Sequence, residues 1–545
     1  MKLVKMIGCF AVGSASFAVR CGRLLFEGRK MLVFFIAALA FAGSEYCAFV
    51  RQEMPTPWVH DEFSQLLAAD TFAHGRITNP PHPLWKHFDT FQVLQSPSYM
   101  TKYFPAQGLI LALGKKLFGH PAFGVWLSMA MMCGAICWML QAWLPQRWVF
   151  LGCMLVILHP ALGINSSFSQ SYFGGAIAAF GSALFLGGLA RLIRKPKVLY
   201  SLLTGFGLAV LANSRPFEGT VLAAASGIMI AYLAWKGKIR VPAKRGLLRA
   251  AVVPFSVVLV LNAGWMMYYN KCVTGHWLVS PYQEYESTHS RVPVFIFQKL
   301  RPPVNFDLEV MRSFEKEHNI SQYEKYSFHD FDSAVSSVTG RLKDFADVFF
   351  PTWFFKILLV FSLAAVFSGD PRLKAVFVLL LAFSAIQTLC IWVYSQYLAP
   401  VLPLYAFLFA WGLREVFSIR INGKNKGRFL AYLLLVGVII SFFSIFQSRL
   451  DWNSRHYFWF QKRARIQAAL ERTGKRHLVI VRYGGIQFDE WVFNDADIDN
   501  SPVVWARSLD PESDAKLQKY FKDRTQWILE VPARGKPRLE KIAPT

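Results

Sequence analysis

The chain has 545 residues, of which 54% are hydrophobic, 16% aromatic and only 17% charged, and its mean hydropathy is +0.32. A water-soluble protein of this length carries more charge and fewer aromatic residues, and the repeated apolar runs approach the roughly 20 residues that cross a bilayer. The net charge of +25 does not indicate a nucleic-acid partner, because the basic residues lie mainly in short loops between apolar runs. The composition therefore predicts a polytopic helical membrane protein.

About eleven apolar segments predict membrane-spanning helices within a transmembrane domain of residues 31–447. Residues 1–30 carry basic residues around a short apolar stretch, which predicts an uncleaved cytoplasmic segment. Two long polar loops, residues 51–121 and 270–350, interrupt the series. The predicted spans cover residues 31–50, 122–143, 148–166, 172–191, 198–214, 217–235, 247–269, 352–368, 373–394, 397–417 and 429–447.

Lysine and arginine gather in alternate loops of this series, and this pattern orients a membrane protein. We expect these loops to be cytoplasmic, together with the N-terminus. The two long loops and the C-terminal tail then face away from the cytoplasm. The basic loops cover residues 191–197, 236–245, 372–374 and 420–428.

The tail, residues 448–545, is polar and predicts a small extracytoplasmic α/β domain. The predicted fold class is therefore an all-α polytopic membrane protein of about 11 transmembrane helices with a small C-terminal α/β domain. Within the tail, strands are expected at residues 477–481, 503–506 and 526–531, and a helix at residues 511–521 that Asp510 or Ser513 caps.

Two adjacent carboxylates, Asp61 and Glu62, lie at a predicted helix start just after the first span. The free amides and the positive end of the helix dipole are expected to keep both carboxylates ionised. A structural interpretation is that Asp61 caps the helix and Glu62 interacts with its dipole. A catalytic interpretation assigns both to the reaction site.

Further polar residues fall at the predicted outer ends of the spans and could form one site at the membrane surface. Arg215 follows a span and is flanked by a proline and a nearby glycine, which favours a fixed turn that presents the guanidinium to a phosphate. Alternatively, Arg215 extends to lipid headgroups, as arginines at span ends often do. The other candidate substrate-binding or lipid-phosphate-binding residues are His82, Gln170, Tyr172, Gln396 and Tyr397.

The arrangement of these elements resembles the GT-C glycosyltransferases. The shared features are an Asp-Glu pair opening the first outer loop, many spans, a Gln-Tyr-Leu-Ala-Pro sequence at residues 396–400 and a soluble tail. The resemblance extends over residues 31–447 in architecture and is closest in sequence at Asp61-Glu62. It includes the protein mannosyltransferases and the aminoarabinose transferases of lipid A. The stretches at residues 61–70, 214–219 and 490–499 also resemble uncharacterised bacterial membrane proteins of this fold.

The resemblance implies a membrane glycosyltransferase, in the inner membrane of a bacterium, that uses a polyprenyl-phosphate-linked sugar. An acceptor hydroxyl on a lipid, glycan or protein would attack the anomeric carbon with inversion, and the lipid phosphate would leave. Asp61 would take the acceptor proton or orient the hydroxyl, and Glu62 would support Asp61 or the sugar. Arg215 would stabilise the phosphate charge.

No cofactor is required by this scheme, although a divalent metal could bind. His60, His74, His82 and His87 lie near the carboxylates, but their spacings match no compact zinc motif. Asp495, Asp497 and Asp499 resemble the first half of an EF-hand loop. The glycine and glutamate that calcium binding needs later in such a loop are absent from this stretch. We therefore assign no metal ligands.

Two other classes of function compete with glycosyl transfer. A transporter or flippase of lipid-linked glycans would place charged or broken helices near the middle of the bilayer. A non-catalytic membrane assembly protein would account for the outer domain, but not for Asp61 and Glu62 beside Arg215.

The orientation can be tested directly. The basic loops place the tail outside the cytoplasm. We therefore predict that a reporter that works only outside the cytoplasm is active when fused after residue 545, and that a reporter that works only in the cytoplasm is not. Paired fusions of alkaline phosphatase and a fluorescent protein would measure this. Activity of the cytoplasmic reporter alone would contradict the topology.

Overall fold

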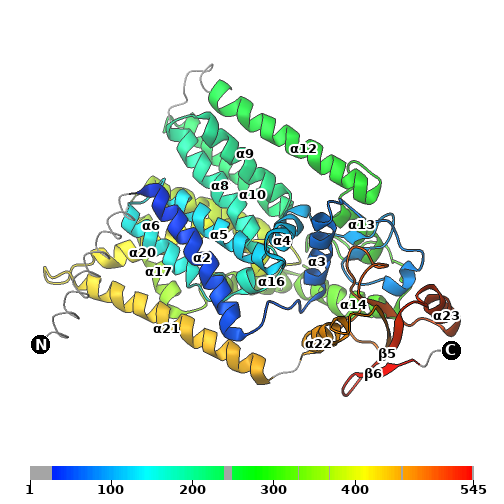
Figure 1. Cartoon of the computed structure of the whole chain (residues 1–545). Coiled ribbons are helices and arrows are strands. Elements are labelled where there is room, and N and C mark those ends of the chain that lie inside the picture. The colour runs from blue at the N-terminus through cyan, green and yellow to red at the C-terminus, as the bar shows by residue number, and fades with distance from the viewer. Residues whose placement is uncertain (1–27, 239–247, 329, 368, 456–457, 543–545) are drawn as a thin grey trace, which may run out of the picture.

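The computed structural model describes residues 28–238, 248–328, 330–367, 369–455 and 458–542. The predicted cytoplasmic segment 1–30 therefore lies almost wholly outside the described residues, as does most of the basic loop 236–245. The described chain forms a helical bundle with a smaller domain at one end (Figure 1).

Each of the predicted spans coincides with a helix. These helices are α2 (Arg29–Arg51), α5 (Ala122–Leu140), α6 (Gln146–Ile157), α8 (Gly175–Arg194), α9 (Val198–Ala212), α10 (Pro216–Trp235), α12 (Val253–Thr274), α17 (Trp353–Val366), α18 (Pro371–Gln387), α20 (Leu402–Ser418) and α21 (Lys426–Arg455).

The number of helices that can cross a bilayer is smaller than the predicted eleven. Among the described residues, seven are long and apolar enough, or eight if α16 (Phe331–Phe349) and α17, bent by 108°, form one span. The apolar helix α6 has only 12 residues, because Pro160 lies just beyond its end and the chain turns there. The chain is thus a multi-pass membrane protein with fewer full-length spans than the apolar segments predicted.

The centre of the bundle is apolar. Helix α20 is buried almost all round, as expected for a helix whose faces are all hydrophobic. Beside it, α8 and α9 approach so closely that a Cβ added to Gly207 would lie 2.5 Å from the carbonyl oxygen of Gly181. Small residues at this contact let the two backbones pack directly.

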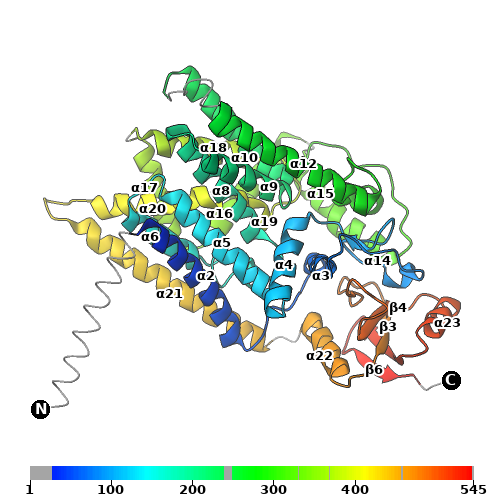
Figure 2. The same ribbon diagram turned by 45° about the horizontal axis from the view of Figure 1, so that its top comes forward.

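The segments between the spans build the end of the bundle that meets the smaller domain (Figure 2). The first loop forms α3 (His60–Ala73), η1 (Trp85–Phe88), β1 (Val93–Leu94), β2 (Met100–Thr101) and α4 (Pro105–Phe118). The remaining segments form α7 (Ser167–Gln170), α13 (Pro281–His289), α14 (Glu309–Phe314), η3 (Glu315–Ile320), α15 (Ser321–Tyr326), α19 (Ser395–Leu398) and η4 (Ala399–Val401).

The C-terminal domain is an α/β unit. Its four-stranded sheet has the order β4-β3-β5-β6, in which β3 pairs in parallel with β4 and β5, and β6 is antiparallel to β5. The domain begins later than residue 448, because α21 remains helical to Arg455. Its elements are α22 (Trp459–Glu471), β3 (His477–Gly484), β4 (Val503–Arg507), α23 (Pro511–Tyr520), β5 (Thr525–Pro532) and β6 (Arg538–Lys541); Asp510 caps α23.

The connection between β3 and β4 docks this domain onto α3. The Phe493 ring stacks on Phe63, with centroids 4.3 Å apart, and the Asp70 carboxylate accepts a 2.8 Å hydrogen bond from the amide of Ala496. Arg463 donates to the carbonyl oxygens of residues 491 and 493 while its guanidinium lies 5.1 Å from the Phe63 ring centroid. The acidic stretch at residues 490–499 therefore attaches the domain to the first loop.

Candidate active site

A cavity of about 950 Å³ lies between the end of the bundle and the C-terminal domain. Aromatic side chains form much of its wall, together with a few charged groups. The lining comes from every segment at this end of the molecule: Trp58–Asp61, Phe91, Gln92, Lys102, Tyr103, Ser167, Phe173, Tyr282, Tyr285, Glu286, His289, Ser290, Phe306, Met311, Phe314, His318, Asn319, Trp392, Tyr394–Tyr397, Phe458–Phe460, Lys462, Phe488 and Asp489.

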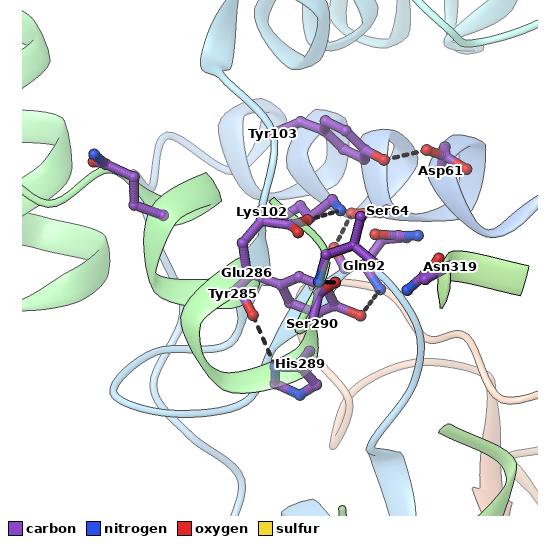
Figure 3. A network of polar contacts seen from close by, with 12 residues as sticks. Asp61, Ser64, Gln92, Lys102, Tyr103, Tyr285, Glu286, His289, Ser290 and Asn319 are labelled. Carbon is purple, nitrogen blue, oxygen red and sulfur yellow. Dashed lines mark hydrogen bonds and ion pairs between the residues drawn. The ribbon is translucent and has the colours of Figure 1, made fainter. Parts of the chain in front are cut away.

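Asp61 lies in the wall of this cavity at the start of α3. The N-cap of the helix is Val59, so Asp61 is the second residue of the helix. The Tyr103 hydroxyl donates a hydrogen bond to Asp61 Oδ1 (Figure 3). Because Asp61 lines the cavity, its carboxylate can meet a ligand there, as a general base requires.

Glu62 has a different environment, although it is the next residue. Its side chain is fully buried and both oxygens accept backbone amides: Oε2 from Trp58 at 2.9 Å and Val59 at 3.4 Å, and Oε1 from Tyr172 at 2.9 Å. Burial raises the pKa of Glu62 to about 8, despite these three donors. The expectation that the helix terminus keeps both carboxylates ionised is therefore wrong for Glu62, because removal from water outweighs the amides.

The two carboxylates therefore have different surroundings. Glu62, rather than Asp61, accepts the amide of the N-cap residue. It also ties the start of α3 to the chain at Tyr172, and it is absent from the cavity lining. The contacts of Glu62 hold the start of α3, and Asp61 on the same helix lines the cavity.

A lysine and a glutamate that sequence reasoning missed form a buried ion pair in the same cavity. Lys102 Nζ lies 2.8 Å from Glu286 Oε1, and both residues are seen in Figure 3. The ring centroids of Tyr282 and Tyr285 lie 5.0 and 4.7 Å from this ammonium. The only sequence signal was a single lysine beside Tyr103, in a stretch otherwise free of charge. The pairing could not be read from sequence because 184 residues separate the partners.

Arg215 is the N-cap residue of α10, with Pro216 in the first turn, as the predicted fixed turn requires. Its guanidinium lies 4.1 Å from the centroid of the Tyr397 ring. Tyr397 and Gln396 line the cavity, whereas Arg215 lies behind Tyr397 and is absent from the lining. The predicted site residues Asp61, Gln396 and Tyr397 are therefore brought together, with Arg215 in contact with one of them.

The structure places the other three predicted binding residues outside this cavity. The Tyr172 hydroxyl donates to the carbonyl of Pro55 at 2.7 Å. The Gln170 amide donates to the carbonyls of Ser44 and Ile164. His82 is buried against the C-terminal domain, where its Nε2 lies 3.3 Å from Asp499 Oδ1. Tyr172 and His82 join segments of the fold, and we do not carry a binding role for them further. Gln170 lines a second, smaller pocket.

The four histidines considered for zinc have separate partners. His60 Nε2 contacts the carbonyl oxygen of Phe488, His74 contacts Asp70, and His87 Nδ1 contacts the carbonyl oxygen of Arg507. Within the part of the chain that the structure describes, no group of three or more histidine, cysteine or acidic side chains is arranged to hold a metal ion.

We predict that the buried Glu62 makes stability depend on pH. The folded pKa of about 8 lies above the ordinary value of 4.5, so the folded chain holds the proton more tightly than the unfolded chain. The resulting stabilisation is complete below about pH 4.5 and is lost as the pH rises through 8; it is on the order of 3–5 kcal/mol. The melting temperature of the detergent-purified protein should fall between pH 6 and 9, and this pH dependence should be weaker in Glu62→Gln. The matched Asp61→Asn variant should keep the parental slope, and equal slopes in all three proteins would contradict the prediction.

Comparison with known proteins gave structural matches only. No protein-family model and no curated protein sequence matches the chain. It is similar to ArnT of Cupriavidus metallidurans in the apo state, with 13% identity over 91% of this chain and 92% of ArnT and a TM-score of 0.48. It is also similar to the oligosaccharyltransferase AglB of Archaeoglobus fulgidus, solved with an inhibitory peptide and a dolichol-phosphate, with 12% identity over 92% of this chain and 69% of AglB and a TM-score of 0.44. These alignments cover about 90% of the chain at low identity, and they assign no role to any residue.

Proposed function

We propose that this protein is a membrane glycosyltransferase that moves a sugar from a polyprenyl-phosphate carrier to an acceptor hydroxyl. The observation that carries the proposal is the Asp61 carboxylate, which lies in the wall of a large cavity at the end of the membrane helices and is held by Tyr103. A cavity at this level can receive the headgroup of a lipid whose chain stays in the bilayer. Its aromatic walls and few charged groups suit a ligand with apolar and polar faces.

The reaction is one displacement at the anomeric carbon. The acceptor oxygen forms the new bond to this carbon, the bond to the carrier phosphate breaks, and the phosphate leaves with the electron pair. Asp61 accepts the hydroxyl proton or orients the hydroxyl for attack, while the Tyr103 hydrogen bond fixes the carboxylate. A single displacement inverts the configuration of the sugar.

The departing phosphate carries negative charge and needs a cation or hydrogen-bond donors. Lys102 lines the cavity but is already paired with Glu286. Arg215 lies over the ring of Tyr397, and the hydroxyl of Tyr397 can donate to a phosphate oxygen. We therefore assign the phosphate to Tyr397 and Arg215 together, with the guanidinium charge favouring the anion from behind the ring.

The distribution of polar residues favours an enzyme over a transporter. The central helix α20 is buried among apolar side chains through the middle of the bundle. The charged lining residues gather at this one end of the molecule: Asp61, Lys102 and Glu286 from the bundle side, and Lys462 and Asp489 from the C-terminal domain. Transport by alternating access instead places its binding groups near the middle of the membrane.

The role of Asp61 can be tested by Asp61→Asn. The amide keeps the shape of the side chain but cannot accept the acceptor proton, so transfer should fall by about 10²- to 10⁴-fold while carrier binding is retained. The measurement is release of undecaprenyl phosphate from a panel of undecaprenyl-phosphate sugars by protein in nanodiscs. Asp332→Asn, which changes an exposed carboxylate on α16, is the matched control. Near-parental transfer by Asp61→Asn would assign Asp61 a structural role.

The role of Arg215 predicts a graded effect. Arg215→Ala removes the guanidinium charge. A hydrogen bond to a charged group contributes roughly 1.5–3 kcal/mol, so transfer should slow by about ten- to a hundredfold and carrier affinity should fall. Arg215→Lys keeps the charge but not the planar contact with the Tyr397 ring, and should retain part of the affinity with a reduced rate. Carrier affinity and transfer rate should be measured in the same nanodiscs. If both variants stay within about twofold of the parent, the phosphate site lies elsewhere.

A further inference from the structure

A second, smaller pocket of about 370 Å³ adjoins the cavity. Trp58, Ser167 and Ser395 line both, so the two spaces share a wall. The remaining lining residues are mostly polar or basic: Arg51, Ala161, Ser166, Gln170, Ser171 and Arg449.

Two arginines from different membrane helices meet at this pocket. Arg51 is the last residue of α2, and Arg449 lies near the end of the apolar part of α21. Arg51 donates to Asn165 Oδ1, and Arg449 donates to the carbonyl oxygen of Pro160 at 3.3 Å. Among the side chains that the structure describes, neither guanidinium forms an ion pair with a carboxylate. Both arginines therefore bring positive charge to the same pocket without a carboxylate in contact.

One polar atom of this pair is buried without a protein partner. Arg51 Nε has no hydrogen-bond acceptor in the described structure although it is shielded from solvent. A buried donor of this kind costs about 1–3 kcal/mol unless a ligand or water accepts from it. The dipole of α2 favours a positive charge at its C-terminus and so accounts for Arg51. It does not account for Arg449, which comes from another helix and lines the same pocket.

The position of the pocket indicates what its ligand is. Arg51 ends the apolar helix α2, and Arg449 lies one residue before the end of the apolar part of α21. Residues at the ends of membrane spans lie near the level of the lipid phosphates. Guanidinium groups bind phosphate oxygens in two-pronged geometry, and hydroxyl groups of serine can add donors. A phosphate attached to a lipid matches both the positive charge of the site and its position at the ends of the membrane helices.

We propose that the smaller pocket binds a lipid-borne phosphate and that this lipid is the acceptor of the transfer reaction. The acceptor role rests on the proposed function, whereas the phosphate site does not. With its phosphate between Arg51 and Arg449, the acceptor extends past Trp58 into the cavity, where its hydroxyl reaches Asp61 three residues along the chain. The donor phosphate is held separately by Tyr397 and Arg215. The substrate class is thus an anionic lipid acceptor.

Binding can be measured without any transfer reaction. Native mass spectrometry of the full-length protein in detergent would quantify didecanoyl phosphatidic acid, with didecanoylglycerol as the lipid without phosphate and glycerol 3-phosphate as the phosphate without chains. We expect the parent protein to bind one molecule of phosphatidic acid tightly. Binding should be at least tenfold weaker in R51Q/R449Q and should be retained in R51K/R449K. The matched control R147Q/R249Q removes two exposed arginines at other helix ends and should bind as the parent does.

Three results would overturn the phosphate site: parental binding by R51Q/R449Q, equal loss in R147Q/R249Q, or equally tight glycerol 3-phosphate, which would indicate a site for free phosphate esters. The folded state of each variant is checked by its melting temperature, and the lysine variant separates charge from folding.

The acceptor role has its own readout. In a transfer assay with a membrane-lipid extract as acceptor, R51Q/R449Q should raise the apparent KM for the extract at least tenfold and leave the KM for the donor unchanged. A raised donor KM would contradict the acceptor assignment. If phosphatidic acid binds as expected but the parent transfers no sugar, the glycosyltransferase proposal fails and the phosphate site stands.

Discussion

The geometry of the site depends on one buried carboxyl group. Glu62 accepts three backbone amides, from Trp58, Val59 and Tyr172, and these contacts join the start of α3 to the segment before α8. Because the acceptors are two oxygens of one rigid group, the contacts fix the direction in which the helix begins. Asp61 is carried into the cavity as a consequence. The cost is a fully desolvated carboxyl whose pKa is raised to about 8.

The C-terminal domain completes the same site. Its strands share a hydrophobic core with the first loop, in which Leu67, Phe88 and Tyr99 pack with Leu478 and Phe521. The domain is held further by the stacking of Phe493 on Phe63 and by the Asp70 contact to Ala496. Since Trp459, Lys462 and Asp489 from this domain line the cavity, its docking encloses the space in which Asp61 lies. A displacement of the domain would open the cavity to water and weaken every electrostatic interaction in it.

The sequence predicted the features that depend on local pattern. Apolar runs located the helices, and three strands of the tail, β3, β4 and β5, lie within about three residues of their predicted positions because apolar residues mark them. The edge strand β6 was not predicted. Asp61, Gln396 and Tyr397, which the sequence singled out, line the same cavity, whereas Glu62 is absent from its lining. The pattern overestimated full-length spans, since helix α6 ends before Pro160 and the apolar run does not.

What the sequence could not supply was the pairing of distant residues. Lys102 with Glu286 and Asp70 with Ala496 are separated by 184 and 426 positions, and no periodicity connects them. The different fates of Asp61 and Glu62 also required the fold, because adjacent helical residues point about 100° apart and only packing decides which one is buried. His82 was assigned to a ligand because it lies in a polar cluster on the predicted outer face, a position that serves a domain interface equally well.

The most direct test of the account is an electron cryo-microscopy structure of the protein in a nanodisc with undecaprenyl phosphate bound. The account predicts the phosphate inside the cavity beside Asp61, with a phosphate oxygen in hydrogen-bond contact with the hydroxyl of Tyr397 and Arg215 directly behind that ring. Phosphate density in the middle of the bundle, or on a surface away from Asp61 and Tyr397, would contradict it.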